Sequence, residues 1–118
     1  GRSWTGVDAG PNNDVLYQSA TGVGPGTWEN GVLDYWDIKA NYESSYDKYR
    51  HAEAQVPWLY NGNNFISYDD PQAIQDKANY ILSNSLAGAM FWELSCDERG
   101  VPAPAGSLLD TLYNTLNP

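Results

Sequence analysis

Leu86-Ala87-Gly88-Ala89-Met90-Phe91-Trp92-Glu93 is a nearly unbroken apolar run that ends at a carboxylate, and the predicted fold is built around it. The run is too short for an isolated helix, and apolar residues on both faces are typical of a strand covered on both sides, as in a parallel sheet. Gly88 and Ala89 would let neighbouring elements approach closely. The sequence therefore predicts a strand over residues 86–93, with Trp92 at its carboxyl end, where α/β folds place their ligands.

Helices are predicted on both sides of this strand. Upstream, Asp70 is a suitable helix cap and Pro71 occupies the first helical position. The apolar stripe of that helix consists of Ile74, Ala78, Ile81 and Leu82. Downstream, Ser107-x-x-Asp110 is a capping-box variant that opens a helix reaching Leu116. The order helix, strand, helix predicts an α/β fold for the C-terminal half.

The N-terminal half predicts a helix that follows a long loop region. Residues 1–31 are rich in Gly, Pro, Asn, Asp and Ser, and such a composition is typical of loops. Leu33, Trp36 and Ala40 follow helical spacing, and Asn30 is a reasonable cap just before them.

A hairpin is predicted after this helix. Val56–Tyr60 and Phe65–Tyr68 are β-like segments, and they flank the turn sequence Asn61-Gly62-Asn63-Asn64. Because Pro57 has no amide donor, we expect its strand at an edge of the sheet.

Composition limits the classes of partner. The 118 residues have the size of one domain and carry a net charge of −9, so no basic patch is available for nucleic acid or for an anionic membrane surface. A neutral polysaccharide carries no such penalty. Nine Tyr and five Trp offer flat apolar faces with a polar handle, which suits sugar or peptide binding. Ordinary amphipathic packing explains the same composition equally well.

Several residues that could take part in catalysis or ligand binding lack the neighbours that such a role requires. Cys96 is the one cysteine and has no metal-ligand spacing around it, so no disulfide, metal or other cofactor is predicted. His51 lacks a Ser-His-Asp frame. The glycine cluster at residues 22–26 is followed by no lysine and makes a poor phosphate loop. No stretch resembles a signal peptide or a membrane span.

Carboxylates beside tryptophans are the remaining candidates. Glu29 adjoins Trp28 and Glu93 adjoins Trp92, while Asp69-Asp70 precedes a helix. A pair of carboxylates across a cleft would suggest glycoside hydrolysis, although most such acids are surface charges or caps. Trp92 is either a core residue or a platform in a cleft. One indole face buries about 100 Å² against a sugar ring, worth roughly 2–3 kcal/mol at about 25 cal/mol per Å².

Four ordered motifs give the chain a family resemblance. They are Gly1-Arg2-Ser3-Trp4-Thr5-Gly6-Val7, Gly26-Thr27-Trp28-Glu29-Asn30-Gly31-Val32, Phe65-Ile66-Ser67-Tyr68-Asp69-Asp70 and Gly88-Ala89-Met90-Phe91-Trp92-Glu93. Together they resemble segments of the family-18 glycoside hydrolases, the chitinases, and in particular bacterial and fungal enzymes that carry a small α+β insertion domain.

The resemblance implies the C-terminal part of a (β/α)₈ TIM barrel. Residues 1–3 would be the end of barrel strand 7, and residues 4–66 would be the insertion domain that walls one side of the cleft. Residues 67–118 would be the barrel's C-terminal segment. Within it, residues 67–85 would be helix 7, residues 86–93 strand 8 and residues 107–116 helix 8.

The resemblance also implies substrate-binding positions. Trp92 matches the tryptophan that floors the subsite of the scissile sugar, and Arg2 matches an arginine that hydrogen-bonds sugar in the cleft. Trp28 and Glu29 match an insertion-domain pair that contacts the sugar chain in related enzymes. Glu93 matches a residue beside the floor tryptophan.

The family's proton donor is absent from these residues. It lies in an Asp-x-x-Asp-x-Asp-x-Glu motif at the end of strand 4, and neither this motif nor the supporting tyrosine after strand 6 occurs here. No catalytic residue is therefore predicted within this chain. We expect it to be part of a secreted, extracellular chitinase, with chitin or chito-oligosaccharides as substrate and the missing N-terminal barrel portion as its partner. By itself it should be inactive.

Two other interpretations stay open. Trp28 and Trp92 without an acid would also suit a non-catalytic chitin-binding protein. The third is a structural fragment without a ligand, whose unpaired strand edges would make the barrel portion marginal or prone to association.

Overall fold

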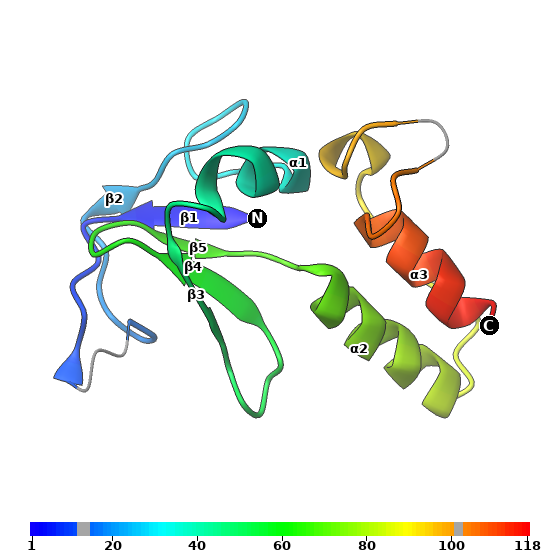
Figure 1. Cartoon of the computed structure of the whole chain (residues 1–118). Helices are drawn as coiled ribbons and strands as arrows, with labels where there is room; N and C mark the ends of the chain where they lie inside the picture. Colours follow the sequence, from blue (N-terminus) through cyan, green and yellow to red (C-terminus); the bar gives the residue numbers. More distant parts are fainter. Residues whose placement is uncertain (12–14, 101–102) are drawn as a thin grey trace. The chain divides into compact units, whose positions relative to one another are not determined.

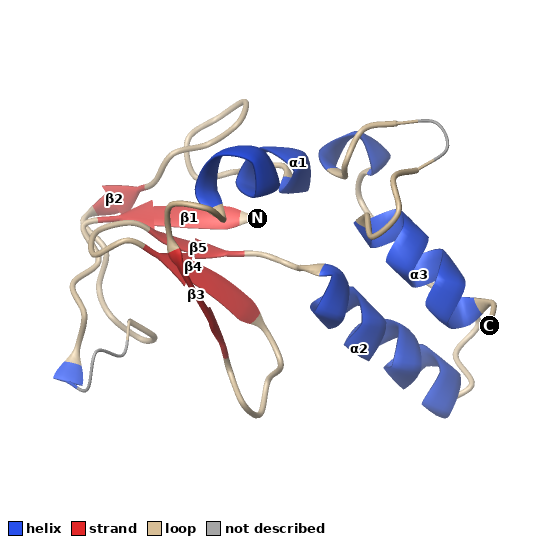
Figure 2. Ribbon diagram, in the orientation of Figure 1, coloured by secondary structure: helices blue, strands red, loops and turns tan. Residues whose placement is uncertain are grey.

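The computed structural model describes residues 1–11, 15–100 and 103–118. These residues form two compact units, Gly1–Tyr68 and Asp69–Pro118. The first unit is built on an antiparallel sheet and the second on two helices (Figures 1 and 2). Which segments belong to an inserted domain and which to a barrel stays a prediction.

The sheet of the first unit has five strands in the order β2-β1-β5-β4-β3, all paired antiparallel. The strands are β1 Arg2–Thr5, β2 Gly22–Val23, β3 Asp47–Arg50, β4 Pro57–Tyr60 and β5 Phe65–Ser67. In this register Ser3 lies opposite Ile66, and Ile66 lies opposite Leu59. This row is fully buried, since all three residues are at most 2% exposed.

Side chains alternate between the two faces of a strand, so the residues next to this row point to the opposite face of the sheet. That face is aromatic. Trp58 and Tyr60 are buried there, in a cluster with Val7 and Val15. The Tyr60 hydroxyl donates to the Val7 carbonyl at 2.6 Å, so the aromatic face also fixes the loop that follows β1.

The predicted hairpin is confirmed, but the edge position of its first strand is wrong. β4 and β5 pair on either side of the turn at residues 61–64. The Asn61 side chain accepts from the backbone amides of Asn63 and Asn64, which fixes the turn. β4 lies between β5 and β3. Pro57 is tolerated in this interior strand because it is its first residue, where a missing donor costs least.

The helix predicted from Asn30 onward starts later and changes character. α1 covers only Tyr35–Asp37, with Asp34 as its N-cap, and a π-helical turn, Ile38–Tyr42, continues it. Residues 29–32 cannot be helical because Val32 forms bridges with both Arg2 and Glu29. The helix therefore begins only after this turn ends.

In the second unit, both predicted helices are confirmed. α2 is Pro71–Ser83 and α3 is Leu108–Leu116, with a short 3₁₀ turn, Leu94–Cys96, between them. α2 and α3 pack side by side and run in the same direction (Figure 1). The Ser107 hydroxyl accepts from the Asp110 amide at 3.1 Å, as the capping box requires.

The strand predicted over residues 86–93 is not formed. Those residues are irregular, and Met90 and Trp92 are 85% and 88% exposed. A strand needs a neighbour to satisfy its backbone groups, and every strand of the described residues belongs to the first unit. The observed architecture is thus an antiparallel sheet plus helices rather than a parallel α/β sheet. No helix in the described part of the chain is long and apolar enough to cross a membrane.

Candidate functional site

The segment Gly26–Val32, here called the Trp28 loop, is a tight turn closed by its own backbone. The Thr27 amide donates to the Val32 carbonyl at 2.9 Å, and the Val32 amide donates to the Glu29 carbonyl at 3.2 Å. Gly26 is required by this closure, because a Cβ there would lie 1.8 Å from the Glu29 carbonyl oxygen. The loop therefore presents Trp28 and Glu29 from a fixed backbone.

The Trp28 loop is attached to β1. The Ser3 amide donates to the Gly31 carbonyl at 3.1 Å, and Val32 forms bridges with both Arg2 and Glu29. Three of the predicted site residues, Arg2, Trp28 and Glu29, are thereby brought into one exposed region of the first unit. Trp28 and Glu29 are neighbours in the sequence, whereas Arg2 lies 26 residues before Trp28 and is brought to the loop by its bridge with Val32.

Trp28 is exposed but anchored. Its side chain is 76% exposed, yet the indole Nε1 donates to Asp34 Oδ2 at 2.9 Å. The same carboxylate oxygen accepts from Trp36 Nε1 at 3.0 Å. Asp34 itself is only 4% exposed. Asp34 was not predicted as a site residue from the sequence; the available signal was an aspartate, a favoured N-cap residue, at the start of α1.

A second buried carboxylate holds the loop to the helix. Asp37 is 8% exposed and accepts from Thr27 Oγ1 at 2.6 Å and from Asn41 Nδ2 at 2.7 Å. Thr27 Oγ1 in turn accepts from the Asp34 amide at 3.0 Å. Burial, and secondarily the negative charge of Asp37, raises the pKa of the Tyr42 hydroxyl above its ordinary value of 10.0.

Trp92 and Glu93 belong to the second unit. The Trp92 side chain is 88% exposed, so it is not a core residue of this structure. Glu93 is also exposed and accepts a hydrogen bond from the Ser95 hydroxyl. The peptide bond between Trp92 and Glu93 is cis.

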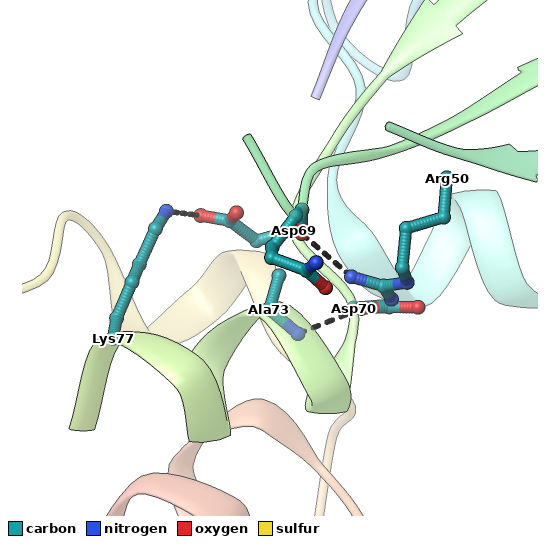
Figure 3. Close-up of polar contacts among 6 residues, drawn as sticks. Arg50, Asp69, Asp70, Ala73 and Lys77 are labelled. Carbon is teal, nitrogen blue, oxygen red and sulfur yellow. Dashed lines mark hydrogen bonds and ion pairs between the residues drawn. The ribbon is translucent and has the colours of Figure 1, made fainter. Parts of the chain in front are cut away.

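The Asp69-Asp70 pair has a structural role. Asp70 Oδ1 accepts from the Ala73 amide at 2.9 Å and caps α2, as predicted. Asp69 forms an ion pair with Lys77 at 2.5 Å (Figure 3). These contacts account for both carboxylates without a catalytic role.

The exposed groups of this region offer both apolar and hydrogen-bonding surface. The exposed Trp28 indole provides an apolar face, while Glu29 and Arg2, whose backbones are bridged through Val32, offer hydrogen-bond acceptors and donors. In the described ranges, no three His, Cys, Asp or Glu side chains are grouped so that they could hold a metal ion.

Comparisons with known proteins agree on one family. Residues 1–97 match the model of the glycosyl hydrolases family 18. Chitinase A1 of Niallia circulans is 47% identical over 102 residues, which cover 82% of this chain and 14% of that protein. The chain therefore spans only a small part of the length of this relative.

Solved structures give the same result. The chain is similar to chitinase ChiA74 of Bacillus thuringiensis, with a TM-score of 0.82 and 38% identity over 98% of this chain and 21% of that one. A family-18 N-acetylglucosaminidase of Paenibacillus barengoltzii gives a TM-score of 0.77 at 35% identity, over 98% of this chain and 31% of that one.

Proposed function

Since the chain belongs to glycosyl hydrolase family 18, we propose that it is the C-terminal part of a secreted chitinase that hydrolyses β-1,4-linked N-acetylglucosamine polymers. The observation that carries this proposal is the exposed, anchored Trp28 beside Glu29 and Arg2, within a segment that matches the family over residues 1–97. In this proposal the chain binds substrate and does not cleave it.

The proposed barrel positions follow from the same family membership. Residues 1–3 would end strand 7, residues 4–66 would form the insertion domain, and residues 67–118 would complete the barrel. α2 and α3 would be helices 7 and 8. Residues 86–93 would become strand 8 once neighbouring strands are present to pair with their backbone. Their present irregular, exposed state is what a strand without neighbours should show.

The proposed mechanism retains configuration and uses the substrate's own N-acetyl oxygen as nucleophile. The proton for the glycosidic oxygen must come from a carboxylic acid outside these residues, because the chain contains no Asp-x-x-Asp-x-Asp-x-Glu motif. Trp92 would lie beneath the reacting sugar, with Glu93 beside it. Trp28, Glu29 and Arg2 would hold other sugars of the polysaccharide. Held this way, the sugar can be distorted toward the transition state.

Aromatic stacking should dominate the binding of a neutral sugar. Each exposed indole contributes roughly 2–3 kcal/mol if it buries about 100 Å². Such a contribution alone gives a dissociation constant weaker than about 1 mM. The 118 residues should therefore be held by polymeric chitin, where many sites are offered, more readily than by single sugars.

Retention on chitin beads tests the proposal. The wild-type chain should be retained, and both Trp28→Ala and Trp92→Ala should reduce retention. Tyr80→Ala is the matched control, because it removes a 63% exposed aromatic ring from α2, outside the proposed site. Equal retention of the wild type and both tryptophan variants would remove the carbohydrate-binding role.

A non-catalytic chitin-binding protein is the second candidate, favoured by exposed tryptophans in a chain without the acid motif. Both candidates predict retention on chitin, and neither predicts that the 118 residues release sugar from it. They differ in the sequence upstream of Gly1. The acidic strand-4 motif there supports the hydrolase, and its absence supports the binding protein.

A further inference from the structure

We propose that Asp34 is a positioning residue for the sugar-binding face of Trp28. Its buried carboxylate holds the indole N–H, so the ring is presented in one orientation before any ligand arrives. This inference rests on the proposed function for the identity of the ligand, an N-acetylglucosamine polymer. The anchoring of the indole can be measured without any ligand.

The contrast in burial between the two partners carries the argument. Trp28 is 76% exposed, whereas Asp34 is 4% exposed. Asp34 Oδ2 lies 2.9 Å from Trp28 Nε1. An exposed aromatic side chain ordinarily samples several rotamers, and a surface residue has no packing that selects one. Here a hydrogen bond to a buried acceptor replaces packing as the constraint.

The Asp34 carboxylate is itself held in place. Its backbone amide donates to Thr27 Oγ1 at 3.0 Å, and Trp36 Nε1 donates to the same carboxylate oxygen at 3.0 Å. Thr27 is further tied to Asp37 at 2.6 Å. Because the acceptor is fixed at the start of α1, the position of the Trp28 edge is fixed as well.

The geometry leaves the correct part of the ring available. Sugar rings stack on the faces of an indole, and the N–H lies on its edge. Anchoring the edge therefore orients the faces without occupying them. A ligand that binds a pre-ordered ring does not have to restrict the ring's motion. The conformational entropy that is not lost on binding corresponds to about a threefold to tenfold gain in affinity.

Exchange of the indole Nε1–H with water, followed by NMR on the ¹⁵N-labelled 118-residue chain, tests the anchor. In the wild type, Trp28 should exchange more slowly than Trp92, whose ring is comparably exposed. Asp34→Ala should bring Trp28 to the rate of Trp92. Asp34→Asn should keep it slow, since the amide oxygen can take the place of Oδ2. An unchanged signal of the buried Trp58 reports that each variant is folded.

Trp36→Phe separates the two indoles that share the carboxylate. It removes one donor and keeps an aromatic ring in its place. Slow exchange of Trp28 should persist in Trp36→Phe, because Asp34 Oδ2 still accepts from Trp28. Fast exchange of Trp28 in this variant, or slow exchange in Asp34→Ala, would overturn the proposed anchor.

Affinity for the tetramer of N-acetylglucosamine tests the consequence for binding. Asp34→Ala should weaken it about threefold to tenfold, and Asp34→Asn should restore it. If Trp28→Ala weakens binding while Asp34→Ala frees the indole without weakening it, the positioning role is wrong. If Asp34→Ala frees the indole and neither variant alters affinity, Trp28 is not a sugar platform, and it is the proposed function that fails.

Discussion

Asp97 caps α3 from a distance: its Oδ2 accepts a hydrogen bond from the backbone amide of Leu109, twelve residues further along the chain, at 2.8 Å. Its Oδ1 accepts from the Leu108 amide at 3.0 Å and from the Glu98 amide at 2.8 Å. Asp97 is 7% exposed, so a buried carboxylate satisfies the free amides at the N-terminus of a helix.

Asp97→Ala should destabilise α3 by about 2–3 kcal/mol, because hydrogen bonds to a charged group are lost and buried amides are left without an acceptor. Hydrogen exchange of the α3 amides measures this. Asn114→Ala, an exposed change on the same helix, is the control and should cost less than about 0.5 kcal/mol. Equal protection of α3 in both variants would contradict the capping role.

The two adjacent carboxylates before α2 should differ in their effect on stability. Asp70→Ala removes a buried N-cap and should cost about 1 kcal/mol or more, measured as lost exchange protection in the first turn of α2. Asp69→Ala removes a solvent-accessible ion pair with Lys77 and should cost less than about 0.5 kcal/mol. The reverse order would show that the cap is not the stabilising contact.

Thr27→Val should loosen the Trp28 loop with almost no change in side-chain volume. The hydroxyl donates to Asp37 and accepts from the Asp34 amide, so its loss leaves two buried partners unsatisfied and should cost about 1–3 kcal/mol. Urea unfolding followed by tryptophan fluorescence measures the loss. Thr21→Val is the control, because that hydroxyl makes one exposed bond at 3.3 Å. A smaller effect at Thr27 than at Thr21 would be inconsistent with the described network.

Gly26→Ala should disrupt the Trp28 loop, since the added Cβ would lie 1.8 Å from the Glu29 carbonyl oxygen and the backbone would have to move. We expect faster exchange of the Trp28 Nε1–H. At Gly22 an added Cβ would meet only Thr5 Cγ2, at 3.8 Å, so Gly22→Ala should be tolerated. Slow Trp28 exchange in Gly26→Ala would mean that the loop closes without glycine.

Ionisation of Tyr42 should oppose folding at high pH. Burial and the nearby Asp37 raise the pKa of its hydroxyl above 10.0 in the folded chain, so the unfolded chain loses this proton first. The resulting contribution to stability is complete below pH 10 and is lost as the pH rises through the folded-state pKa. The phenolate absorbance of wild type minus Tyr42→Phe should therefore have a midpoint above 10. A midpoint at or below 10 would contradict the effect of burial.

Local signals in the sequence predicted the parts of the fold that depend on nearby residues. The caps at Asp70 and Ser107 act over three residues, and the turn at residues 61–64 is fixed by its own asparagine. Composition and spacing carry this information because the interacting groups are close in the chain.

Elements that depend on distant partners were not predicted. The strand expected at residues 86–93 is irregular because strand pairing requires neighbours, and the helix expected from Asn30 gives way to bridges that Val32 makes with Arg2. The capping contact between Asp97 and Leu109 spans a loop whose path no local pattern specifies.

The candidate site was also predicted only in part from the sequence. The family resemblance pointed to Arg2, Trp28, Glu29, Trp92 and Glu93, and their roles toward sugar stay predictions. The carboxylates that support Trp28 and Thr27 were not predicted. In the sequence, Asp34 and Asp37 are only polar residues between the apolar residues of a predicted helix, and such residues are ordinarily exposed. Their burial and their partners became visible only with the loop in place against α1.

The most direct measurement of the central claim is a titration of the 118-residue chain with the N-acetylglucosamine tetramer, monitored at the indole ¹H–¹⁵N signals. We predict saturable shifts of Trp28 and Trp92 and a stationary signal for the buried Trp58, whose side chain is only 9% exposed. Signals of Trp28 and Trp92 that stay in place up to the solubility limit of the tetramer would contradict a substrate-binding role for this segment.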